Sequence, residues 1–172
     1  AISSTGRIHA EGSAAYAVHA VTIGKGEVGV VSAGQVTADG DGARGVNITA
    51  TNVDHDDPAY AVVQRGIVRA SGERARGIVV ESAGSGQLSA AVASGVEVEA
   101  VGTDSIGVQV TGLTSGGLSR RARVAAQIDG GVASDGAYGV GVAITTDDDT
   151  ASLMVSSSGR VFGGWQSDAA SR

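Results

Sequence analysis

Two short acidic runs are the first groups in this sequence with the chemistry to bind a hard cation. One is TNVDHDDP, at residues 51–58, and the other is TTDDDT, at residues 145–150. Calcium takes about six to eight oxygen ligands, and neither run matches an EF-hand loop or a calcium-binding nonapeptide repeat. We therefore predict solvated loop charge with no metal and no other cofactor, and we keep the acidic residues as candidate contacts for a partner. These residues are Asp54, Asp56, Asp57, Asp147, Asp148 and Asp149.

Two arginines offer the complementary chemistry of an anion site. Arg44 and Arg76 occupy the same place in the sequences ARGVNI and ARGIVV. If these sequences stack, the two guanidinium groups repel each other unless an anion or a carboxylate lies between them. The pair is therefore a candidate site for an acidic sugar or for an acidic side chain of a partner. Pairing with Glu73 or Asp41 of this chain is the simpler explanation.

A third candidate is a carboxylate pair, Glu11 and Asp39, at the ends of the similar sequences RIHAE and QVTAD. Stacked one strand apart, the two groups would lie about 5 Å from each other, as retaining glycoside hydrolysis requires. The pattern places no aromatic platform for a sugar near them, and the histidines form no Ser-His-Asp or metal-ligand arrangement. We predict that the chain is not an enzyme, with a β-helical polysaccharide lyase or glycoside hydrolase as the alternative.

Composition excludes several other classes of function. The 172 residues carry a formal net charge of −6 and no dense basic stripe, so nucleic acid is a poor partner. No apolar run approaches the ~20 residues of a membrane helix, so we expect no direct membrane insertion. The chain has no cysteine, which excludes disulfides and thiolate metal sites. Aromatic residues make up 3% and 28 residues are glycine, a composition that favours thin, layered β structure.

The elements that must position these residues follow from an internal repeat of about 30 residues. A first module, GxVxA, occurs as GRIHA, GQVTA and GIVRA, with VEVEA, GGVAS and GRVFG as looser copies. A second module follows as ARGVNI and ARGIVV, with AYAVHA, SIGVQV and AYGVGV as variants. A weaker apolar segment, such as EVGVVSAG, precedes each new start. Each repeat therefore predicts three short strands separated by glycine or polar turns, and no helix.

Most corners carry a lone glycine, which bends a chain without reversing it, and the period is too short for a propeller blade. The repeats therefore predict an all-β, right-handed parallel β-helix of about five to six coils, with a Gly-rich β-sandwich as the alternative.

In such a β-helix, equivalent residues of successive repeats would stack in columns. The first module gives the inward column Ile8, Val36, Val68, Val98, Val132 and Val161. The second gives Val18, Val46, Ile78, Val108 and Val140, then Ala20, Ile48, Val80, Val110 and Val142. The outward column of the two arginines includes Tyr16, Ile106 and Tyr138.

The sequences GQVTADGDGARGVNITA and GIVRASGERARGIVVESAG resemble repeats of autotransporter passenger domains, the secreted β-helical parts of type V secretion proteins of Gram-negative bacteria. The likeness covers residues 6–164 and implies an adhesin at the cell surface or secreted. Its implied partner is a protein or glycan of a host or neighbouring cell, or a second copy of the chain. Neither an outer-membrane barrel nor a serine protease domain has a counterpart in these residues, so the resemblance implies neither anchoring nor proteolysis.

The resemblance and the repeat together give one expectation for the whole chain. We expect residues 1–172 to form a single β-helix segment of a longer passenger, with a purely structural spacer as a further alternative. Insertions at 51–58, 112–121 and 145–150 all follow the second module, so they should emerge along one edge of the prism.

Overall fold

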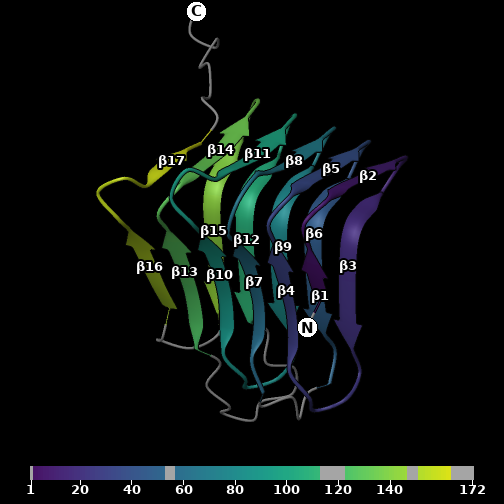
Figure 1. The fold of residues 1–172 in the computed structure, drawn as a ribbon, viewed down its shortest axis with the longest axis vertical. Helices are drawn as coiled ribbons and strands as arrows, with labels where there is room; N and C mark the ends of the chain where they lie inside the picture. Colours follow the sequence, from purple (N-terminus) through teal and green to yellow (C-terminus); the bar gives the residue numbers. More distant parts are fainter. Residues whose placement is uncertain (1, 53–56, 113–122, 147–150, 164–172) are drawn as a thin grey trace, which may run out of the picture.

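The chain winds into a prism whose three sides are parallel β-sheets, and Figure 1 shows its coils stacked side by side. The computed structural model describes residues 2–52, 57–112, 123–146 and 151–163. Sheet A contains β1 Ile2–Ser4, β4 Val28–Ser32, β7 Ala59–Val63, β10 Leu88–Val92, β13 Val124–Ile128 and β16 Ala151–Val155. Sheet B contains β2 Arg7–Glu11, β5 Gln35–Asp39, β8 Ile67–Ser71, β11 Glu97–Val101, β14 Gly131–Asp135 and β17 Arg160–Phe162. Sheet C contains β3 Tyr16–Thr22, β6 Arg44–Ala50, β9 Arg76–Ser82, β12 Ile106–Gly112 and β15 Val140–Thr146.

Each strand pairs in parallel with the equivalent strand of the next coil. Val68 lies between Val36 and Val98, and all three side chains are fully buried. The first inward column is confirmed from Ile8 to Val161. The predicted all-β parallel solenoid, with three short strands in each coil, is therefore confirmed over about five turns.

The prediction for the second module was wrong in the fifth coil by two residues. Val140 pairs with Ile106 and is 41% exposed, whereas Val142 and Ile144 continue the two inward columns. The outward column of the arginines therefore ends in Val140, and Tyr138 lies in the preceding corner at φ 58°. The hydrogen bond from the amide of Val140 to the carbonyl of Ser105 fixes this register. It gives the corner before β15 the same length as the corner before β12.

The corner between sheets B and C is a stack of glycines. Its members are Gly12, Gly40, Gly72, Gly102 and Gly136, and all have positive φ angles of 122–146°. The amide of Gly40 donates to the carbonyl of Ser71 at 2.9 Å, and the amide of Gly72 donates to that of Val101 at 2.9 Å. The parallel hydrogen-bond ladder therefore continues around the corner, which ties the outward face of sheet B rigidly to sheet C.

The strands that flank the predicted insertions belong to sheets C and A in each case. The connections from β6 to β7, from β12 to β13 and from β15 to β16 each lead from sheet C to sheet A, as predicted. Residues 53–56, 113–122 and 147–150 within them lie outside the described residues. In the described part of the chain, no helix has the length and apolar character needed to cross a membrane.

Candidate functional site on the outward face of sheet B

Three columns of residues point outward from sheet B, because alternate residues of a strand face opposite sides. The first column is Arg7, Gln35, Ile67, Glu97, Gly131 and Arg160. The middle column is His9, Thr37, Arg69, Glu99, Ala133 and Phe162. The third column is Glu11, Asp39, Ser71, Val101 and Asp135. We call this surface the sheet-B face.

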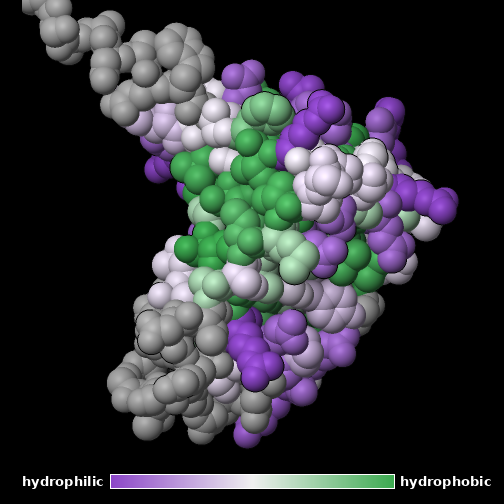
Figure 2. Space-filling model, turned by 90° about the vertical axis from the view of Figure 1, so that its left-hand side faces the viewer, coloured by the Kyte–Doolittle hydropathy of each residue, from purple (hydrophilic) through white to green (hydrophobic). Residues whose placement is uncertain are grey.

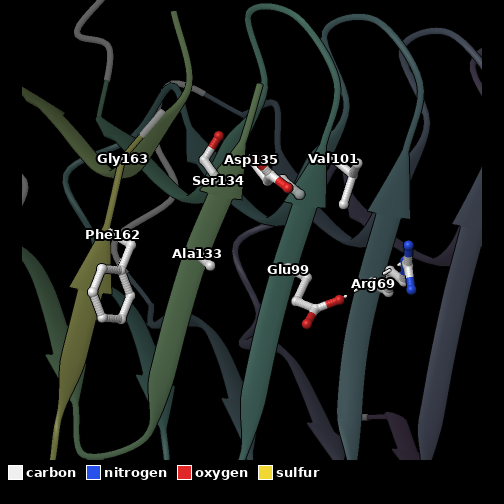
Figure 3. Close-up of a pocket in the computed structure, with 9 residues that line it drawn as sticks. Arg69, Glu99, Val101, Ala133, Ser134, Asp135, Phe162 and Gly163 are labelled. Atoms are coloured by element: carbon white, nitrogen blue, oxygen red, sulfur yellow. Dashed lines mark ion pairs between the residues drawn. The ribbon is translucent and has the colours of Figure 1, made fainter. Parts of the chain in front are cut away.

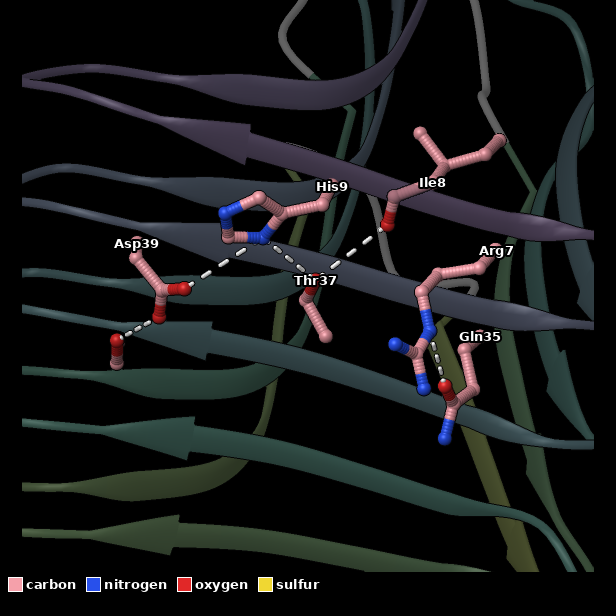
Figure 4. Close-up of polar contacts among 7 residues, drawn as sticks. Arg7, Ile8, His9, Gln35, Thr37 and Asp39 are labelled. Atoms are coloured by element: carbon pink, nitrogen blue, oxygen red, sulfur yellow. Dashed lines mark hydrogen bonds and ion pairs between the residues drawn. The ribbon is translucent and has the colours of Figure 1, made fainter.

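The amino-terminal part of the sheet-B face is occupied by contacts between neighbouring coils (Figure 4). The Nδ1 atom of His9 lies 2.9 Å from the Thr37 hydroxyl and 3.7 Å from Oδ2 of Asp39. The Ser71 hydroxyl donates to the other carboxylate oxygen of Asp39. Glu11 pairs with Asp39 in the ladder as predicted, but Asp39 already contacts two neighbours of its own chain. These contacts indicate a structural role for Asp39.

The carboxy-terminal part of the same face is hollowed into a pocket of about 520 Å³ (Figure 3). Its middle column runs from Glu99 through Ala133 to Phe162, so the small Ala133 side chain stands between two larger ones. Val101 and Asp135 flank it from the third column. The short side chain of Ala133 leaves room above the sheet, and this creates the hollow.

Opposite charges meet at the border of this pocket. The guanidinium Nε of Arg69 lies 3.8 Å from Oε2 of Glu99, and the two side chains are 50% and 34% exposed. Both groups therefore remain accessible to a ligand while each partly neutralises the other. Asp135 adds a carboxylate from the next coil, so the pocket offers hydrogen-bond donors and acceptors together.

The aromatic member of the pocket, Phe162, is a functional candidate that sequence reasoning missed. The looser repeat copy GRVFG places it in the outward column of His9, and this register was the available signal. Its side chain is 59% exposed, and Figure 3 shows the ring nearly face-on from outside the sheet. An accessible aromatic face therefore lines the same pocket as Asp135, at the opposite end of the sheet-B face from Glu11 and Asp39.

The predicted arginine pair is found on the outward side of sheet C. Arg44 and Arg76 are neighbours in the ladder, as the repeat predicted. The expected partners were wrong, because Nη1 of Arg44 donates to Oδ1 of Asn47 at 2.6 Å and lies 4.0 Å from Oε2 of Glu81. The acid next to Arg44 is therefore Glu81, which lies on strand β9 two residues after Val79. It is neither Glu73 nor Asp41.

Arg76 secures the corner between coils. Its Nη1 atom donates to the carbonyl oxygens of Arg74, Ala75 and Asp104, at 2.8, 3.1 and 2.7 Å, and its Nε donates to Gln109. Partial burial, and then the like charge of Arg44, lower the pKa of Arg76 from its usual value. Because its donors already serve the backbone, the guanidinium is better explained as a structural clamp than as an anion site.

The acidic candidates lie almost entirely outside the described residues. Asp57 is exposed, whereas Asp54, Asp56 and residues 147–149 are not described. Within the described ranges, no group of three or more His, Asp or Glu residues is arranged to hold a metal ion.

Comparison with protein-family models, with curated proteins and with solved structures found no match to this chain. A β-solenoid serves both adhesins and enzymes, so its function must be argued from the chemistry of the sites that it carries.

Proposed function

We propose that this chain is a non-enzymatic binding segment of an autotransporter-type adhesin, displayed on or secreted from a Gram-negative cell. Its partner is a protein or glycan on a host or neighbouring cell. The observation that carries the proposal is the pocket at Phe162 and Asp135, in which an exposed aromatic face and charged groups line a hollow on a rigid sheet. Exposed aromatic and charged residues around a concave surface are typical of binding sites.

The architecture supports a contact surface that is fixed before the partner arrives. The inward columns behind the pocket are closely packed, with Val98, Ala100 and Val132 fully buried. Preorganisation of this kind lowers the entropy cost of binding. The repeat along the axis also lets an extended partner meet several coils at once.

Bead attachment tests the proposed function directly. Beads coated with the chain should attach to cultured epithelial cells or to Gram-negative cells more strongly than uncoated beads. Substitution of Arg69, Glu99 and Asp135 by serine should reduce attachment about fivefold or more, because a few residues carry most of the binding energy. The matched control is Gln127→Ser, an exposed residue of sheet A. Wild-type beads that attach no better than uncoated beads, or a chain that cleaves the surface glycan, would refute the proposal.

Self-association is a second candidate function, and apolar residues exposed at the carboxy-terminal end of the prism support it. Figure 2 shows a hydrophobic surface at the end formed by β16 and β17. Leu153, which belongs to an inward column, is 50% exposed there, and Ile2 of β1 is 43% exposed at the other end. The two ends carry parallel edge strands of the same polarity, so one copy of the chain can stack on another.

Sedimentation velocity measures this association. If the ends stack, the weight-average sedimentation coefficient should rise with protein concentration, and Leu153→Asp should abolish the rise. Met154→Asp is the control on the same strand, because Met154 points outward from sheet A, whereas Leu153 belongs to an inward column that is open at this end. A sedimentation coefficient that stays constant with concentration would exclude self-association of the ends.

A further inference from the structure

The pocket on the sheet-B face has the shape of a shallow cradle across several coils. Glu99 and Phe162 stand two strands apart in the middle column, which corresponds to roughly 10 Å at the spacing of paired strands. Ala133 lies between them and forms the floor. The cradle is therefore wide enough to admit a ring-shaped group between the aromatic and the carboxylate side chains.

The Phe162 ring supplies an apolar platform in that cradle. Its face is directed away from the sheet (Figure 3), and no large side chain of the same column follows it among the described residues. The electron-rich face of an aromatic ring attracts groups with partly positive hydrogens, such as the C–H face of a pyranose. A sugar ring laid on Phe162 would therefore turn its hydroxyl groups toward the rim of the pocket.

The rim carries the polar groups that hydroxyls require. A hydroxyl both donates and accepts hydrogen bonds, carboxylates such as Glu99 and Asp135 accept them, and the Arg69 guanidinium donates them. On the sheet-B face, the charged residues of strands β8, β11, β14 and β17 are Arg69, Glu97, Glu99, Asp135 and Arg160, so acids outnumber bases there by one. This balance disfavours a polyanionic ligand.

We propose that this pocket is a binding subsite for a neutral oligosaccharide, with one sugar unit stacked on Phe162 and the hydroxyls of the following units bonded to Asp135, Glu99 and Arg69 across the neighbouring coils. The inference rests on the proposed function, because it names the class of ligand that the sheet-B face binds. A cationic peptide side chain would also suit an aromatic face and a carboxylate. Arg69 partly neutralises Glu99 and adds a positive charge to the pocket lining, so the saccharide fits the observed groups better.

Saturation-transfer NMR with defined tetrasaccharides tests the subsite. The probes are β-1,4-linked tetramers of N-acetylglucosamine and of glucose, the α-1,4-linked tetramer of glucose, tetragalacturonate and tetralysine. At least one neutral tetramer should bind with a dissociation constant of about 1 mM or below, a typical weak affinity on the scale of single-site binding. Phe162→Ala should weaken that binding about tenfold, Phe162→Tyr should retain it, and Asp135→Asn should weaken it several-fold.

A matched control separates the platform from surface aromatics in general. Tyr138 is 60% exposed in the neighbouring corner, so Tyr138→Ala should leave saccharide binding unchanged. Circular dichroism checks that each variant keeps its β structure. The inference is overturned if no neutral tetramer binds at concentrations up to about tenfold above the expected dissociation constant of about 1 mM. It is also overturned if Phe162→Ala binds as tightly as the wild type, or if tetragalacturonate or tetralysine binds more tightly than every neutral tetramer.

The bead-attachment assay distinguishes failure of the saccharide subsite from failure of the proposed function. Attachment that persists without saccharide binding would overturn the subsite and leave the binding segment in place with a protein partner. Saccharide binding without attachment would instead support the subsite and count against the adhesin.

Discussion

Gly72→Ala is expected to lower the free energy of unfolding by about 2–6 kcal/mol, since strained backbone and overpacking each contribute on the order of 1–3 kcal/mol. Gly72 has a φ of 122°, a conformation that side chains rarely adopt, and an added Cβ would overlap the carbonyl oxygen of Gly40 in the coil beneath it. Chemical denaturation followed by circular dichroism measures the loss. The effect is large because the overlapping atom belongs to the backbone, which the hydrogen-bonded corner holds in place.

Gly42→Asp is the control for the prediction at Gly72. Gly42 also has a positive φ, of 72°, but an added Cβ would meet nothing closer than the Cα of Ala14 at 3.9 Å. The same turn position in the other coils holds Ala14, Arg74, Asp104 and Tyr138, all with φ between 53° and 58°. Gly42→Asp should therefore cost about 1 kcal/mol or less. Equal losses at the two glycines would show that backbone conformation, and not the stacking of coils, controls the corner.

The stacked columns explain why much of the fold could be predicted from the sequence. Each coil must present the same residue types at the same depth, so Val36, Val68 and Val98 reveal their shared column through repetition alone. The prediction failed where the motif letters were ambiguous. AYGVGV contains glycines at both Gly139 and Gly141, and only the fixed length of the corner selects Gly141 as the equivalent of Gly107.

The candidate site was less predictable, because side-chain partners depend on which groups lie one coil away. The register of Arg44 and Arg76 was predictable, yet their hydrogen bonds to Asn47, Gln109 and the corner carbonyls require the positions of backbone and side chains in space. The pocket exists because Ala133 is small and lies between two larger residues of the neighbouring coils. These two larger residues are two repeats, about 60 residues, apart in the sequence. The repeat gives this column, but the hollow becomes evident only when the coils are stacked.

Ile48→Ala is expected to destabilise the solenoid far more than Ile144→Ala, although both side chains occupy one inward column of sheet C. Ile48 lies between Ala20 and Val80 and is fully buried. Its truncation should leave a cavity and cost about 2–5 kcal/mol. Ile144 is only partly buried in β15, the edge strand of sheet C among the described residues, so its truncation should cost about 1 kcal/mol.

Native-state hydrogen exchange separates these two effects coil by coil. A solenoid derives stability from contacts between adjacent repeats, so it can open from an end while its centre stays folded. Ile48→Ala should lower the protection of amides in β3, β6 and β9 together, because the cavity weakens both interfaces of its coil. Ile144→Ala should lower protection only near β12 and β15. Equal loss of protection throughout the prism in both variants would mean that the coils unfold as one cooperative unit, in which the position of a side chain along the axis does not matter.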